Sequence, residues 1–154
     1  MSATSKDVKI LRAVASHVDA LVPLFDAYRV FYRQASDLAK ARRYVAERLS
    51  DTEASVFFLA LQRHEAVGFT RLFGTYSSIN TRRLWILEDL YVVPAVRKTG
   101  IATLLMQRAR QHAEETEAVG LTLETAIDNH AAQALYEALG YERERAFYKY
   151  NLTL

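Results

Sequence analysis

One short stretch, Leu90–Met106, constrains the fold of this chain more than any other. Its sequence, LYVVPAVRKTGIATLLM, is typical of an apolar strand that ends at Pro94, followed by a basic turn and a helix that opens at Gly100. A helix N-terminus offers unpaired N–H groups and a partial positive charge, and Arg97 and Lys98 add two full charges beside it. Glycine has no Cβ, so the backbone can approach an anion closely. The stretch therefore predicts a phosphate-binding turn between a strand and a helix.

The two common nucleotide fingerprints do not describe this turn. Neither G-x-G-x-x-G nor G-x-x-x-x-G-K-[ST] occurs in the 154 residues, so we expect a different diphosphate ligand. The 20 basic and 18 acidic side chains nearly cancel, and a net charge of +2 provides little bulk attraction for nucleic acid. We expect no nucleic-acid partner. The rival interpretation, a small nucleic-acid binder, depends on paired arginines such as Arg82 and Arg83.

Length and composition indicate one globular domain over residues 1–154. Hydrophobic residues make up 51% of the chain and charged residues 25%, as in ordinary soluble proteins. The chain has no Cys, which excludes thiol catalysis, disulfides and thiolate zinc sites, and its 4 His are scattered, so we expect no metal site. No apolar run has the length of a signal peptide or membrane span, so we expect a cytoplasmic protein without a membrane partner.

Hydrophobic periodicity predicts the element order β-α-α-β-β-β-α-β-α-β. The expected helices cover residues 17–32, 36–50 and 130–139, with one more from Gly100 onward. The expected strands cover residues 8–14, 55–63, 66–78, 82–93, 121–127 and 146–154. Three consecutive strands favour antiparallel pairing, whereas the strand, helix and strand around Gly100 favour a parallel βαβ unit. This order predicts an α/β fold with a mixed, mostly antiparallel sheet flanked by four helices.

Two motifs in this chain resemble those of the GNAT family of N-acetyltransferases. Arg97-x-x-Gly100-x-Ala102 is similar to the family's acetyl-CoA-binding motif, [RQ]-x-x-G-x-[GA]. The segment NHAAQALYEALGY, residues 129–141, is similar to the family's second signature, N-x-x-A-x-x-L-Y-x-x-x-G-[FY]. The two motifs occur in the family's order and at about its spacing. The resemblance implies a GNAT-like fold, in which a twisted sheet splays around acetyl-CoA.

The resemblance also implies a cofactor site, residue by residue. A strand bulge would leave the main chain of Leu90, Tyr91 and Val92 facing the pantetheine arm of acetyl-CoA. Asn129 matches the family's Asn near that arm, although a plain helix N-cap explains it as well. The pyrophosphate would be held by the main chain of Arg97, Lys98, Thr99, Gly100, Ile101, Ala102 and Thr103. Ala102 stands where the second Gly of the motif is commoner.

The catalytic candidates also come from the resemblance. Tyr136 corresponds to the tyrosine that usually gives a proton to the departing thiolate, although a core aromatic is its plain alternative, and Tyr136 would also contact the cofactor. Glu88 and then Glu124 are the candidates for the base or amine anchor, against a plain surface ion pair. Neighbouring strand residues face opposite sides, so Glu88 and Asp89 cannot both point into one pocket. An N–H group near Leu90 would meet the oxyanion.

The acceptor would be selected by the first two helices, the connection between them and the hairpin. Tyr32, Arg33, Tyr76 and Glu88 are the candidate contacts. The sequence therefore predicts an acetyl-CoA-dependent transferase that acetylates a primary amine of a small molecule, near the small-amine and polyamine branch, by direct attack in a ternary complex. The alternatives are a protein N-terminal or lysine acetyltransferase and a non-catalytic acyl-CoA-binding module. A homodimer is expected by analogy, through the aromatic strand at residues 147–152.

Overall fold

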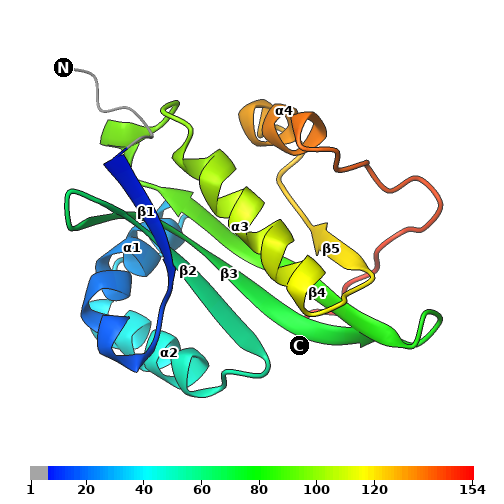
Figure 1. Cartoon of the computed structure of the whole chain (residues 1–154), viewed down its shortest axis with the longest axis horizontal. Helices are drawn as coiled ribbons and strands as arrows, with labels where there is room; N and C mark the ends of the chain where they lie inside the picture. The colour runs from blue at the N-terminus through cyan, green and yellow to red at the C-terminus, as the bar shows by residue number, and fades with distance from the viewer. Residues whose placement is uncertain (1–6) are drawn as a thin grey trace. The chain divides into compact units, whose positions relative to one another are not determined.

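The computed structural model describes residues 7–154. They fall into two compact units, one that ends at Glu124 and one that covers Thr125–Leu154 (Figure 1). The first unit contains the strands β1 (Val8–Arg12), β2 (Ser55–Gln62), β3 (Glu65–Ser77), β4 (Arg82–Val92) and β5 (Gly120–Leu123). Its helices are α1 (Val18–Phe31), α2 (Leu38–Ser50) and α3 (Ile101–Glu115), with short 3-10 turns η2 (Ala15–His17) and η3 (Pro94–Val96). The second unit contains α4 (His130–Ala138).

The five strands form one sheet in the order β1-β2-β3-β4-β5. The first four strands are antiparallel, and β5 pairs with β4 in parallel after the α3 crossover (Figure 1). A parallel pair needs such a crossover, because the chain must return to the starting end of the sheet. The predicted mixed α/β sheet with four helices is confirmed.

The two faces of the sheet are covered by different helices. On one face, Phe57 and Phe69 pack with α1 and α2 in a cluster whose core residues include Leu21, Phe25 and Val45. On the other face, α3 packs through the buried side chains Leu105, Met106 and Ala109. Successive strand residues point to opposite faces, which explains why β2, with the sequence SVFFLALQ, is apolar on both sides. Burying one such Leu or Phe contributes about 1.5–3 kcal/mol.

Capping residues mark where two of the helices begin or end. Asp37 caps α2 by accepting a hydrogen bond from the Lys40 N–H at 3.0 Å. Gly140 follows α4 with a φ of 90°, a left-handed conformation that glycine adopts readily. The expected start of the first helix at residue 17 is one residue early. Residues 15–17 form a 3-10 turn before the helix, and His17 is its N-cap.

Two predicted strands differ from the structure. The predicted final strand, residues 146–154, is wrong: these residues form no strand, and Phe147, Tyr148 and Tyr150 are at least 78% exposed. Aromatic residues favour a strand only when a neighbouring backbone pairs with it, and this segment has no sheet partner within residues 7–154. The predicted strand 121–127 is shorter, because its pairing with β4 ends at Leu123.

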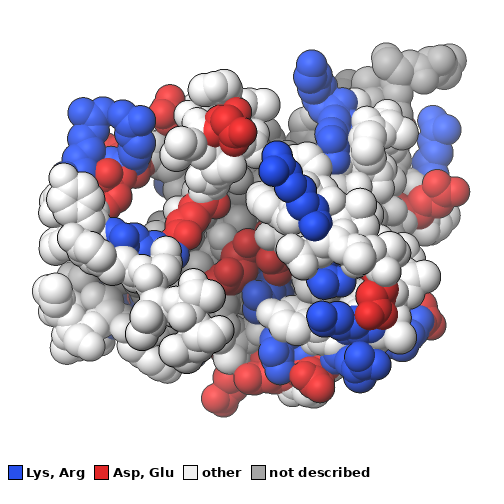
Figure 2. All heavy atoms as spheres, turned by 180° about the vertical axis from the view of Figure 1, so that it is seen from behind, with Lys and Arg blue, Asp and Glu red and all other residues white. Residues whose placement is uncertain are grey.

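The outer surface of α2 carries basic side chains mixed with acidic ones. Figure 2 shows a group of Lys and Arg side chains at the lower right, where α2 lies, with Asp and Glu between them. Arg42 pairs with Asp19 at 2.7 Å, and Arg48 lies 3.3 Å from Glu47. The local charges are therefore partly neutralised. Among the helices of residues 7–154, none is long and apolar enough to cross a membrane.

Candidate functional site

The basic turn between β4 and α3 has the geometry of an anion site. Lys98 has a φ of 63° and Gly100 a φ of 91°, so the chain reverses sharply before the helix. A left-handed conformation costs a residue such as Lys roughly 1–2 kcal/mol. The first hydrogen bond of α3 runs from the Leu104 N–H to the Gly100 carbonyl at 3.1 Å. The N–H groups of residues 101–103 at the helix start are therefore available to a phosphate.

Arg97 joins this turn to β4 and to the end of α1. Its Nε donates a hydrogen bond to the Val92 carbonyl at 2.8 Å. The guanidinium carbon lies 5.5 Å from the centre of the Tyr91 ring and 5.6 Å from that of Phe31. Such cation–π contacts contribute about 0.5–1 kcal/mol each at exposed sites. The side chain therefore organises the turn, a role that the sequence motif does not indicate.

A β-bulge in β4 lies before the turn. Arg71 of β3 is opposite Asp89, but the next residue, Leu72, is opposite Leu87, so Glu88 is the extra residue of the bulge. Because of this extra residue, Leu87 and Asp89 lie opposite successive residues of β3 and so point to opposite faces of the sheet, where both are buried, Asp89 against Arg71. The Glu88 side chain is exposed between them. As predicted, the side chains of Glu88 and Asp89 do not point into one pocket: Glu88 is exposed and Asp89 is buried.

The pairing of β4 with β5 ends at this bulge. Leu87 and Leu123 are the last register partners, and residues 88–92 of β4 continue beyond the end of β5. Glu88 and Glu124 each follow one of these partners, and both are exposed. The structure therefore brings the two candidate carboxylates to the same end of the β4–β5 pair. Within residues 88–92, Leu90, Tyr91 and Val92 have no β5 neighbour, which is the arrangement that an inserted ligand arm needs.

A buried polar group that no sequence pattern indicates lies beneath the bulge. Arg71 donates from Nε to Asp89 Oδ2 at 2.7 Å, and these side chains are 7% and 10% exposed. The Tyr28 hydroxyl donates to the main-chain carbonyl of Glu88 at 3.3 Å. Burial, and then the charge of Asp89, raises the pKa of Tyr28, so its hydroxyl keeps its proton. Tyr28 and Glu88 are 60 residues apart in the chain, so no local sequence signal indicates this contact.

The candidate acceptor residues fall in two places. Tyr32 and Arg33 are exposed at the end of α1, and the Tyr32 ring lies 5.0 Å from that of Tyr28, which contacts the bulge. Tyr76 is 68% exposed on β3 and lies under the Arg83 guanidinium at 4.6 Å. Five residues separate Tyr76 from Arg71 on the strand, about 16 Å at the usual rise. The structure thus brings Tyr32 near the bulge, but not Tyr76.

The other candidates belong to the second unit. Asn129 is the N-cap of α4, and its side chain accepts a hydrogen bond from the Ala132 N–H at 3.2 Å. Tyr136 is half-buried on α4, with its ring 6.1 Å from that of Tyr141. The N-cap alternative for Asn129 is therefore observed. The roles of Asn129 and Tyr136 toward the cofactor stay predictions.

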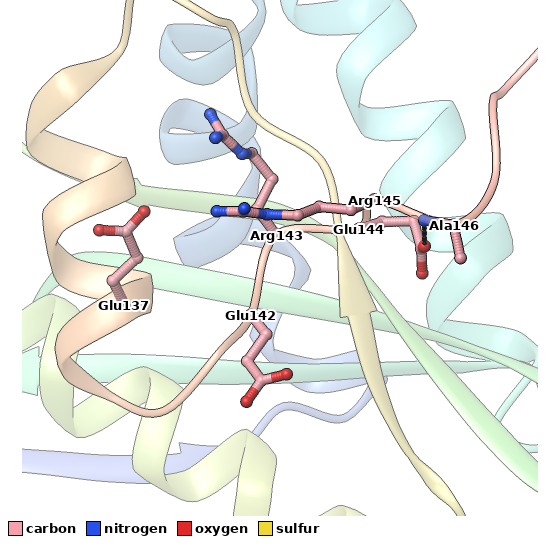
Figure 3. A pocket seen from close by; sticks show the side chains of 6 residues that line it. All are labelled: Glu137, Glu142, Arg143, Glu144, Arg145 and Ala146. Atoms are coloured by element: carbon pink, nitrogen blue, oxygen red, sulfur yellow. Dashed lines mark hydrogen bonds between the residues drawn. The ribbon is translucent and has the colours of Figure 1, made fainter.

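The second unit also contains an open hollow of about 820 Å³. Figure 3 shows that α4 contributes Glu137 to it and that the segment after α4 contributes the other lining residues, which are Glu142, Arg143, Glu144, Arg145 and Ala146. Glu144 accepts a hydrogen bond from the Phe147 N–H at 3.2 Å. None of the predicted site residues lines this hollow.

A comparison with protein families decides the identity of the chain. The model described as "Acetyltransferase (GNAT) family" matches residues 21–141. The chain belongs to the GNAT family. An uncharacterized N-acetyltransferase of Bacillus subtilis, YhfO, is 42% identical over 147 residues, which are 96% of this chain and 98% of that protein. The chain is accordingly an acetyl-CoA-dependent N-acetyltransferase.

Solved structures and a further relative add to this assignment. A crystal structure of a probable acetyltransferase has a TM-score of 0.89 and 38% identity, covering 95% of this chain and 97% of the other. An aminoglycoside N-acetyltransferase in complex with CoA has a TM-score of 0.78 at 18% identity, with coverage of 96% and 95%, and shows the shared fold. An aminoglycoside N(6')-acetyltransferase of Acinetobacter haemolyticus is 28% identical over 119 residues, 75% of this chain and 79% of that protein.

The residues of this GNAT protein fit the cofactor that its family uses. The available N–H groups at the start of α3, together with the charge of Lys98, suit a pyrophosphate. The continuation of β4 past β5 suits an extended arm. Residues 7–154 contain no group of three or more His, Cys, Asp or Glu side chains that could hold a metal ion.

Proposed function

We propose that this N-acetyltransferase acetylates a primary amine of a small molecule by direct attack in a ternary complex. The observation that carries the proposal is the exposed carboxylate of Glu88, in the bulge where β4 leaves β5. A carboxylate there can attract an ammonium group and accept its proton beside the cofactor arm. The relative named as an aminoglycoside acetyltransferase supports a small polyamine as the kind of acceptor.

The proposed binding roles follow the site geometry. The main chain of residues 97–103 holds the pyrophosphate, with the N–H groups of residues 101–103 as donors, and Leu90, Tyr91 and Val92 hold the pantetheine arm. When bound, acetyl-CoA supplies the acetyl group as an activated thioester. Asn129 contributes to the arm in addition to capping α4. Tyr32 and Arg33 line the acceptor side at the end of α1, and Tyr76 contacts only acceptors that extend along β3.

The proposed proton transfers use three side chains. Glu88 removes a proton from the acceptor ammonium, which makes the amine nucleophilic. Glu124 follows Leu123, the last residue of β5 that pairs with β4, and is the alternative acceptor of that proton. A main-chain N–H near Leu90 or Tyr91 donates to the oxygen on which negative charge develops. The Tyr136 hydroxyl gives its proton to the leaving sulfur, because a phenol is protonated at neutral pH.

The direct test is thiol release from acetyl-CoA in the presence of pooled amines, with CoA binding measured by calorimetry on the same sample. We expect release above the hydrolysis blank with polyamines or aminoglycosides. Release only with peptides would favour the protein N-terminal or lysine alternative. CoA binding with no release from any amine would favour the non-catalytic module, and no CoA binding would overturn the proposal.

Tyr136→Phe tests the proton donor. We expect kcat to fall about 10²–10⁴-fold, the usual contribution of a general acid, with the Kd for CoA unchanged. The matched control is Tyr148→Phe, which removes a hydroxyl from a side chain that is 90% exposed. Unchanged turnover in Tyr136→Phe would remove this residue from the mechanism.

A homodimer also belongs to the proposal, by analogy with the family. The predicted C-terminal strand does not form, so we no longer assign the dimer contact to it. Light scattering at micromolar concentration would give twice the mass of the 154-residue chain, and a monomer mass would reject the dimer.

A further inference from the structure

The buried pair of Arg71 and Asp89 lies directly beneath the bulge. Arg71 Nε donates to Asp89 Oδ2 at 2.7 Å, and Arg71 Nη1 lies 3.4 Å from the Ser55 hydroxyl. The side chains of the pair are 7% and 10% exposed. Both face α1 and α2, where the Tyr44 ring lies 5.7 Å from the Arg71 guanidinium. The pair is therefore an ionic contact inside an otherwise aromatic and aliphatic core.

Stability alone gives no reason for a buried ion pair at this position. Removing two charges from water costs several kcal/mol each, and well-packed apolar residues of similar volume are often equally stabilising or better. The neighbours on the same face, Phe57, Phe69 and Tyr91, show that apolar side chains fit there. The contacts of the pair therefore matter more for its role than its contribution to stability.

The contacts of the pair indicate what that role is. Asp89 is the residue after the bulge, and its main-chain carbonyl accepts a hydrogen bond from the Thr70 hydroxyl at 2.8 Å. The carbonyl of Glu88 accepts from the Tyr28 hydroxyl at 3.3 Å. A bulge leaves its extra residue without ladder hydrogen bonds. Contacts from α1 and β3 thus hold the backbone at the point where the ladder does not.

We propose that Tyr28, Asp89 and Arg71 are positioning residues that hold the bulge so that Glu88 faces the acceptor amine. This inference depends on the proposed function, in which Glu88 is the acceptor-side carboxylate. Asp89 is not itself a base, because its carboxylate is buried against Arg71. Tyr28 contributes a hydroxyl that stays protonated and therefore donates to the Glu88 carbonyl at every working pH.

The first test removes one hydroxyl. In Tyr28→Phe we expect kcat to fall about tenfold, with the Kd for CoA and the urea midpoint close to the wild-type values. Amide hydrogen exchange at residues 88–90 should become at least tenfold faster, whereas exchange in β2 should not change. Tyr44→Phe is the matched control, because it removes a hydroxyl and keeps the ring over Arg71. Wild-type kcat and wild-type exchange in Tyr28→Phe would overturn the inference.

The second test separates positioning from stability. The double variant Arg71→Met/Asp89→Leu replaces the pair by apolar side chains of similar size, and we expect a urea midpoint near that of the wild type. Its kcat should stay at least tenfold low and its exchange at residues 88–90 fast. A stable double variant with full kcat and slow exchange would show a merely structural pair and overturn the inference.

The two tests also distinguish this inference from the proposed function. If the wild-type protein releases no thiol with any amine, the proposed function fails. The exchange rates of Tyr28→Phe and of the double variant would still show whether the three residues hold the bulge. If the wild-type protein is active but exchange at residues 88–90 is the same in all variants, only the positioning inference fails.

Discussion

The buried polar groups on the two faces of the sheet differ: one face contains an ion pair and the other a neutral histidine. On the α1 and α2 face, Arg71 and Asp89 form a buried ion pair, with Arg71 Nε 2.7 Å from Asp89 Oδ2. On the α3 face, His112 is 6% exposed between two rings, with centroids 4.8 Å from Trp85 and 5.7 Å from Phe58. Its Nε2 has no hydrogen-bond partner among the described residues. Burial, and then the charge of Arg12, lowers the pKa of His112 to about 4, so the imidazole of His112 is neutral at pH 7.

The difference between the faces follows what lies on each side. The charged pair is beneath the bulge, where backbone geometry affects the candidate site. The α3 face packs the crossover helix on the sheet, and there a titratable side chain is held in its neutral form. The first face thus uses charge to orient the chain, whereas the second depends on close packing. The predictions below test this contrast, beginning with the largest expected effect.

Breaking the ion pair from one side should have the largest effect. Arg71→Met leaves the Asp89 carboxylate buried without its partner, which we expect to lower the free energy of unfolding by about 3–5 kcal/mol. Urea denaturation at pH 7 measures this. Arg110→Met is the control, because its pair with Glu114 is on the surface and should contribute at most about 0.5 kcal/mol. Equal effects of the two changes would contradict the contrast.

Acid should destabilise the protein through the α3 face. The pKa of His112 is about 4 in the folded chain, below its ordinary value of 6.5, so the unfolded chain binds more protons between these values. The contribution of neutral His112 to the free energy of unfolding is fully present above pH 6.5. It falls by up to about 3 kcal/mol as the pH approaches 4. Urea midpoints between pH 7 and pH 4.5, followed by Trp85 fluorescence, measure this loss.

A histidine comparison isolates this contribution from that of the carboxylates. His112→Leu should flatten the dependence of the urea midpoint on pH between 6.5 and 4.5. His64→Gln removes an exposed imidazole and should leave the dependence as in the wild type. A slope that is unchanged by His112→Leu would show that other groups cause the loss.

Adding one methyl group should show how closely the α3 face is packed. A Cβ at Gly74 would lie 2.9 Å from an atom of the Trp85 ring and 2.7 Å from Arg83 Nη1. We expect Gly74→Ala to lower stability by about 1–3 kcal/mol. Gly120→Ala is the control, since a Cβ there meets no atom within 4 Å. Thermal unfolding measures the Tm of the two variants. An equal Tm for both would contradict close packing at Gly74.

Arg97 should show the smallest effect, measured on binding. Arg97→Ala removes its hydrogen bond to the Val92 carbonyl and its contacts with Phe31 and Tyr91. We expect the Kd for CoA to rise about tenfold, equivalent to about 1.4 kcal/mol, with little change in the urea midpoint. Calorimetry with CoA measures this, with Arg110→Ala as the control. An unaltered Kd would remove Arg97 from the cofactor site.

Local sequence signals were enough to predict most of the fold. Apolar periodicity indicated both helices of the first face, and Pro94 and Gly100 marked the turn between β4 and α3. These signals act over a few residues, because caps, turns and helical spacing depend on near neighbours in the chain. They failed at residues 146–154, where aromatic composition predicted a strand but no backbone partner is present.

The sequence by itself therefore determined the family, the order of the elements from β1 to α4 and the turn between β4 and α3, since each depends on short local patterns. Only the tertiary structure decided which residues meet beneath the site. Arg71 and Asp89 are 18 residues apart and come together because the register of β3 and β4 shifts at Glu88. Register, bulge position and the contact of Tyr28 with β4 depend on how whole elements pack, which no local pattern encodes.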